Sequence, residues 1–93
     1  MLDKTGVVLQ ALLKLVDIYG FDYIKKHKNS PYAYKEEDDG TFTISFLFES
    51  NKDRPDIPSD YLGWAVYATV NVNPETTEVV LNGGRLQNGS KIS

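Results

Sequence analysis

The chain has 93 residues, a net charge of −3 and no cysteine. This length fits a single domain, residues 1–93, and the content of 41% apolar and 25% charged residues is that of a globular chain. The absence of cysteine excludes disulfides, thiolate metal sites and cysteine nucleophiles. Nucleic-acid-binding domains are usually basic, so the mildly acidic composition argues against nucleic acid as a partner.

Residues 3–19 form a predicted helix, which Asp3 or Thr5 can cap. At about 100° per residue, Gln10, Lys14 and Asp17 fall on one narrow polar stripe, and the other positions from residue 7 to residue 19 are apolar. The apolar arc spans about 240° by this construction. A helix that lies on one sheet face needs an arc only somewhat wider than about 100°.

This excess of apolar surface has two explanations. A second copy of the chain can cover it, since dimers are the commonest soluble oligomers, or the loop at residues 50–63 can fold over it. The first explanation makes four residues candidates for self-association: Val7, Ala11, Leu15 and Ile18. The apolar stretch is too short and too polar to span a bilayer, and it does not resemble a signal segment, so we expect a cytoplasmic protein with no membrane partner.

Gly20 interrupts the helical pattern and is interpreted as a C-cap. Asp22 is then expected to cap a short second helical turn that runs to Lys28, the alternative being a single kinked helix through Gly20. Pro31 ends the helical region.

Two segments alternate with a period of two and predict strands at 41–49 and 64–72. Their large apolar side chains share one face and form the expected core. Shorter strands are expected at 32–34 and 78–82, and a hairpin at 82–84 would add another at 85–87. Residues 86–93 are small and polar and are expected to form a flexible tail.

No catalytic, metal or cofactor site is predicted, and we do not expect an enzyme. The acidic run 36–39 reads as a solvated hairpin turn, because Lys35 stands where a calcium-binding loop needs its first ligand. The basic run 25–28 lies at a helix end, where cations are favoured. His27 is the only histidine, and no nucleotide-binding or nucleophile motif is present.

The sheet face opposite the expected core is almost free of charge. Threonine and tyrosine fit any pleated surface, but a neutral face with tyrosine and leucine is also typical of a protein interface. The long loop at 50–63 adds apolar residues that either contribute to recognition or cover the helix. The candidate partner-binding residues are Ser45, Leu47, Ile57, Tyr61, Tyr67 and Thr69.

Residues 64–81 carry a family resemblance. A strand that begins at Trp64 runs into the turn Asn73-Pro74-Glu75-Thr76-Thr77-Glu78-Val79. This stretch resembles the strand–turn–strand of small bacterial PepSY-like and YrhB-like immunity domains, whose turn reads Asp-x-x-Thr-Gly-Glu-Val. The chain departs from that pattern at Asn73 and Thr77. The resemblance implies a helix before antiparallel strands and a protein that binds or inhibits other proteins.

Together these features predict an α+β fold in which an N-terminal helix packs on a three- to four-stranded antiparallel sheet, cystatin-like in outline. The expected function is a non-enzymatic protein-binding module, specifically a bacterial or phage immunity or inhibitor protein. The alternative is a homo-oligomeric structural or accessory protein of a phage or bacterial assembly. The expected partner is therefore another protein or, as a homodimer, the chain itself.

Overall fold

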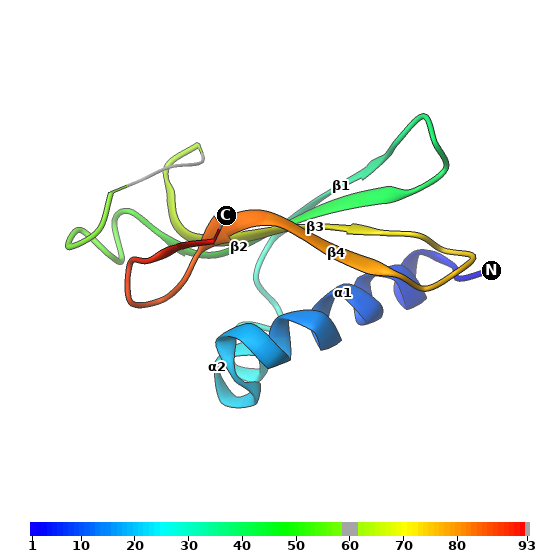
Figure 1. Ribbon diagram of the computed structural model, residues 1–93. Coiled ribbons are helices and arrows are strands. Elements are labelled where there is room, and N and C mark those ends of the chain that lie inside the picture. Colours follow the sequence, from blue (N-terminus) through cyan, green and yellow to red (C-terminus); the bar gives the residue numbers. More distant parts are fainter. Residues whose placement is uncertain (59–61, 93) are drawn as a thin grey trace.

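The computed structural model describes residues 1–58 and 62–92 (Figure 1). Two helices precede a five-stranded antiparallel sheet whose strands lie in chain order, so that each strand pairs with the next. The helices are α1 (Lys4–Tyr19) and α2 (Phe21–Lys26). The strands are β1 (Tyr32–Glu36), β2 (Phe42–Ser50), β3 (Trp64–Val72), β4 (Val79–Arg85) and β5 (Lys91–Ile92). This arrangement confirms the predicted α+β class, with five strands rather than three or four.

Short-range signals set the helix ends. The Asp3 carboxylate accepts a hydrogen bond from the backbone N–H of Gly6 at 2.9 Å, as expected of an N-cap. Gly20 separates the two helices with φ of 94°, a conformation that favours glycine. The predicted cap at Asp22 is wrong, because Gly20 itself precedes α2 and Asp22 lies in the first turn.

The core lies between α1 and one face of the central strands. Buried residues alternate along both strands, with Ile44, Phe46 and Phe48 on β2 and four alternate positions from Val66 to Val72 on β3. Each position on this face removes apolar surface from water, which is the main favourable contribution to folding. The period-two pattern of the sequence therefore identifies the inner face correctly.

Three of the four predicted self-association residues are wrong. Val7, Ala11 and Leu15 are fully buried against the sheet of their own chain, and Ile18 is partly buried against the same core. The first three lie four residues apart, so they form one ridge along α1 that a single sheet face can cover. The apolar excess of the helix lies elsewhere, at Leu9 and Leu13, which are each 53% exposed.

The C-terminal residues continue the sheet, and the expected tail at 86–93 is wrong as far as residue 92. The predicted hairpin at 82–84 is wrong too, because β4 runs through these residues and the chain turns later, where the Leu86 N–H donates to the Ser90 carbonyl at 2.8 Å. β5 then pairs with Gly84 and Arg85. Gly84 packs so closely on the backbone of β3 that a Cβ atom would not fit there, a constraint that strand alternation does not encode.

Candidate protein-binding face

The two helices lie on the same side of the sheet, which leaves its other side, the outer face, without a helix (Figure 1). The register of β2 and β3 places the side chains of this face in pairs: Ser45 opposite Thr69, and Leu47 opposite Tyr67. Four of the six predicted partner-binding residues are thus brought together on two adjacent strands. None of these four side chains is charged, and the charged residues Arg85 and Lys35 border them on the same face, paired with Tyr67 and Thr43.

Short polar side chains on the outer face bond to one another. The hydroxyl oxygens of Ser45 and Thr69 lie 3.1 Å apart, and the Asn71 side-chain amide donates to the hydroxyls of Thr41 at 2.9 Å and Thr43 at 3.3 Å. Ser45 is only 6% exposed, so it orders its neighbour and offers little surface to a partner. These cross-strand bonds order the face, because each restrains the rotamers of side chains on neighbouring segments.

The other two predicted binding residues, Ile57 and Tyr61, belong to the long loop between β2 and β3. Ile57 is partly buried, and its side chain lies close to Gly89 in the turn between β4 and β5. Tyr61 lies outside the described residues. Leu62, at the end of the same loop, is 87% exposed. The loop therefore does not cover Leu9 and Leu13 with Ile57 or Leu62, the two of its expected apolar residues that are described.

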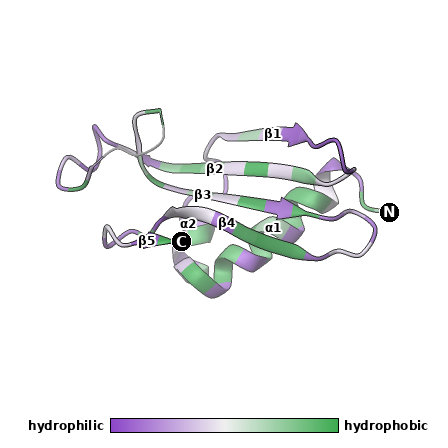
Figure 2. Ribbon diagram, turned by 45° about the horizontal axis from the view of Figure 1, so that its top comes forward, coloured by the Kyte–Doolittle hydropathy of each residue, from purple (hydrophilic) through white to green (hydrophobic). Residues whose placement is uncertain are grey.

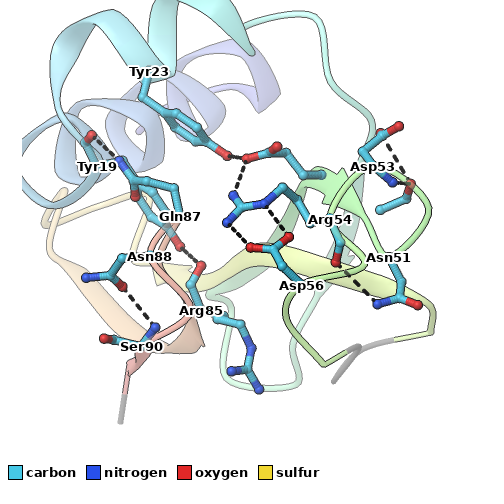
Figure 3. Close-up of polar contacts among 12 residues, drawn as sticks. Tyr19, Tyr23, Asn51, Asp53, Arg54, Asp56, Arg85, Gln87, Asn88 and Ser90 are labelled. Atoms are coloured by element: carbon cyan, nitrogen blue, oxygen red, sulfur yellow. Dashed lines mark hydrogen bonds and ion pairs between the residues drawn. The ribbon is translucent and has the colours of Figure 1, made fainter.

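A polar cluster ties α2 to the start of the long loop (Figure 3). The Tyr23 hydroxyl donates to the Glu49 carboxylate at 2.5 Å, and Arg54 Nη1 lies 3.5 Å from the same carboxylate oxygen. Arg54 also holds Asp56 through two hydrogen bonds, of 3.1 and 3.0 Å. Sequence reasoning missed this cluster, because its members come from three segments and no spacing links them.

The environment of this cluster changes two pKa values. Burial, then the hydrogen bond to the ionised Glu49, raises the pKa of Tyr23. The His27 ring lies beside the Tyr23 ring, tilted by 40° and with centroids 4.3 Å apart, and it also contacts Phe48. Burial lowers the pKa of His27, while the nearby Glu49 carboxylate opposes this shift. Both pKa shifts favour the neutral forms of Tyr23 and His27, as expected of a closely packed aromatic contact with a structural role.

Tyr19 forms a second contact between the helices and the sheet. Its hydroxyl lies 2.8 Å from the carbonyl of Tyr67 and 2.9 Å from that of Arg85, and burial raises its pKa. The Gln87 side chain donates back to the Tyr19 carbonyl at 3.0 Å (Figure 3). These bonds fix the end of α1 to β3 and β4, so Tyr19 and Gln87 have a structural role.

A pocket of about 210 Å³ opens at the opposite end of the molecule, between the β1–β2 hairpin and the β3–β4 turn. Its lining includes Glu36, Asp39 and Glu75. In the described part of the chain, no group of three or more histidine, cysteine or acidic residues is arranged to hold a metal ion. Over the same residues, no helix is both long and apolar enough to cross a membrane.

Comparison with family models, with curated proteins and with solved structures found no match. The resemblance of residues 64–81 to PepSY-like and YrhB-like immunity domains therefore stays a prediction.

Proposed function

We propose that the protein is a non-enzymatic protein-binding module that recognises its partner through the outer face of the sheet. The observation that carries the proposal is the uncharged side-chain array of Leu47, Tyr67 and Thr69, ordered by the buried Ser45, on a sheet side that bears no helix (Figure 1). An uncharged patch with leucine and tyrosine suits a protein partner better than a small molecule, because small ligands need a concave site and the pocket described above lies elsewhere.

The ionisable side chains of the polar cluster give additional support to a non-enzymatic role. Glu49, Arg54 and Asp56 bond to one another or to Tyr23, so their charges are compensated within the fold. A general acid or base needs a proton-transfer partner in reach and a pKa near the working pH, and these groups serve as mutual anchors instead. The resemblance of residues 64–81 narrows the proposed role to a bacterial or phage immunity or inhibitor protein.

The test compares one substitution on the two sides of the molecule. Leu47→Lys adds a charge to the outer face, whereas Leu13→Lys adds the same charge to the exposed side of α1. The immobilised protein captures proteins from an extract of its native host, and mass spectrometry identifies them. We expect a partner that is retained by the wild type and by Leu13→Lys and lost with Leu47→Lys.

Circular dichroism establishes that both variants remain folded. A partner that is lost with Leu13→Lys and kept by Leu47→Lys would reject the outer face as the binding surface. A chemical reaction catalysed by the purified chain would reject the non-enzymatic role.

A second function, a homo-oligomeric accessory protein, is favoured by one observation. Leu9 and Leu13 lie four residues apart on α1, and each is about half exposed. An apolar pair at this spacing forms a stripe that a helix of another copy can cover. Light scattering tests this alternative, which requires an oligomer that dissociates when Leu13→Lys is introduced.

A further inference from the structure

β1 is an edge strand, and no backbone group of residues 1–58 or 62–92 bonds to its outward side. Within the described residues it pairs with β2 alone. Two backbone bonds set the alternation: the Leu47 N–H donates to the Pro31 carbonyl at 3.0 Å, and the Glu37 N–H donates to the Thr41 carbonyl at 2.8 Å. Odd-numbered residues therefore bond to β2, and Tyr32, Tyr34 and Glu36 direct their N–H and C=O groups outward.

The same three residues place their side chains on the helix side of the sheet. Tyr32 pairs with Phe46 and Tyr34 with Ile44, both of which belong to the core face. Lys4 of α1 extends over this margin, with Nζ 5.9 Å from the Tyr32 ring centroid and 5.1 Å from that of Tyr34. Tyr32 nevertheless remains 40% exposed. The edge thus combines unpaired backbone groups with a partly covered aromatic surface.

Charge is distributed unequally along the direction of β1. The strand leads into the acidic hairpin 37–39, and the pocket lining places Glu75 beside Glu36 and Asp39 at this end. Figure 2 shows this hairpin as a hydrophilic tip near the N-terminus. Before the strand, α2 and the segment that follows it expose Lys25, Lys26 and Lys28. The two ends of β1 are therefore of opposite charge.

We propose that the edge of β1 binds the β1 edge of a second copy of this chain, antiparallel and about a two-fold axis at Tyr34. This register pairs all five residues of the strand with the five residues of the copy. Tyr34 faces Tyr34 of the copy, Tyr32 faces Glu36, and Ala33 faces Lys35. All three outward N–H groups and all three carbonyls then find partners, as the alternation requires.

Charge complementarity favours a second copy of the chain as the partner of the β1 edge. In an antiparallel pair, the acidic hairpin of one copy lies beside the basic segment 25–28 of the other, and this contact occurs twice by symmetry. Lys35 and Glu36 would oppose pairing with an uncharged strand, as charges on sheet edges generally do. They meet no like charge in this register. The inference does not depend on the proposed function, which uses the outer face.

Sedimentation velocity over a range of protein concentrations tests the dimer. We expect a monomer–dimer equilibrium that weakens as salt is added, because the charged ends are exposed and screened. Tyr34→Pro removes one outward N–H from each copy and leaves the β1–β2 bonds intact. The dissociation constant should rise on the order of tenfold, given the usual worth of two hydrogen bonds. Tyr34→Phe is the matched control and should dimerise like the wild type.

A charge exchange provides the second test, on residues whose side chains are exposed and lie outside the strand. Asp38→Lys and Lys28→Glu should each weaken the dimer several-fold, and the double variant should restore it, because the exchanged charges meet again across the axis. Lys52→Glu, on the loop away from β1, should have no effect. A chain that stays monomeric up to about 1 mM, a millimolar affinity being the weakest expected here, would overturn the proposal. So would a dimer that is insensitive to both Tyr34→Pro and the charge exchange.

Discussion

Leu13 and Leu15 lie two positions apart on α1, yet the fold places them in opposite environments. Leu15 is fully buried on the ridge that faces the sheet, and Leu13 is half exposed. Leu15→Ala should therefore lower the free energy of unfolding by about 2–5 kcal/mol, because it removes buried methyl groups and leaves a cavity. Leu13→Ala should change it by less than about 1 kcal/mol. Urea denaturation measures both, and similar losses at the two positions would contradict this packing of α1.

Gly83 and Gly84 offer a second matched pair. Both have positive φ, so alanine is strained at either position, but only at Gly84 would the new Cβ collide with backbone atoms of Tyr67 and Ala68. At Gly83 the nearest atom, the Ile92 carbonyl oxygen, would lie 3.7 Å away in ordinary contact. Gly84→Ala should therefore lower the unfolding midpoint in urea clearly further than Gly83→Ala. Equal effects would mean that backbone strain alone, and not the close approach of β3, requires glycine here.

Helix α2 is attached to the sheet by an aromatic contact in which one side chain, His27, titrates. Its pKa lowered by burial, His27 binds a proton less readily in the folded protein than in the unfolded chain. At pH values above the ordinary histidine pKa of about 6.5, His27 is neutral in both states, and its packing does not lower the free energy of unfolding. The folded protein loses stability as the pH falls through the lowered pKa that His27 has in the folded state. Glu49 opposes the shift and Lys26 adds to it.

His27→Gln removes this titration. The wild type should lose stability between neutral and mildly acidic pH, before the carboxylates titrate, and the variant should lose less over the same interval. Thermal unfolding at a series of pH values measures the difference. Parallel curves for the two proteins would show that His27 has the same proton affinity in both states and would contradict the burial effect.

The elements that follow from the sequence are those with a regular pattern. The alternation in β2 and β3 identifies the inner face, and Asp3 and Gly20 mark the ends of α1, because caps and strand faces depend on nearby residues. What could not be predicted depends on residues distant in sequence. The placement of Val7 within the core, the attachment of α2 through Tyr23 and Glu49, and the pairing of β5 with Gly84 all require the assembled fold.

The candidate binding face shows the same limit. Alternation correctly places Ser45, Leu47, Tyr67 and Thr69 on one side of the sheet, but it does not reveal that Ser45 is buried there. Ser45 lies on a central strand between Ala33 and Thr69 and is hydrogen-bonded to Thr69, and sequence periodicity contains no measure of the burial that results. Likewise, the wide apolar arc of α1 could not show which of its positions the sheet would leave exposed.

For the molecule as a whole, the chain-order sheet gathers like charges that are scattered in sequence. The β1–β2 hairpin and the β3–β4 turn lie at the same end of the sheet (Figure 1). Glu36, Asp39 and Glu75 of these two segments line a single pocket there. Clustered charges of one sign destabilise a compact state through mutual repulsion. Asp38, in the same hairpin, is exposed, and among residues 1–58 and 62–92 no hydrogen bond to its side chain offsets its share of that repulsion.

Asp39, its neighbour, has a compensating role. Hydrogen bonds from the hydroxyl and the backbone N–H of Thr41 lower the pKa of Asp39, because they favour its ionised form. That contribution is present above the carboxylate's ordinary pKa and is lost as pH falls through the lowered folded value. Two adjacent aspartates should therefore respond to the same substitution in opposite directions.

Asp38→Asn should raise the melting temperature in low salt by about 1–3 °C, the shift expected for a few tenths of a kcal/mol in a domain of this size. The gain should shrink as salt screens the repulsion. Asp39→Asn should lower the melting temperature, because the amide accepts the two bonds from Thr41 more weakly than a carboxylate does. Calorimetry on dilute protein, where self-association does not contribute, measures both. A loss of stability in Asp38→Asn, or a gain that persists in high salt, would show that repulsion at this end of the sheet does not limit the stability of the fold.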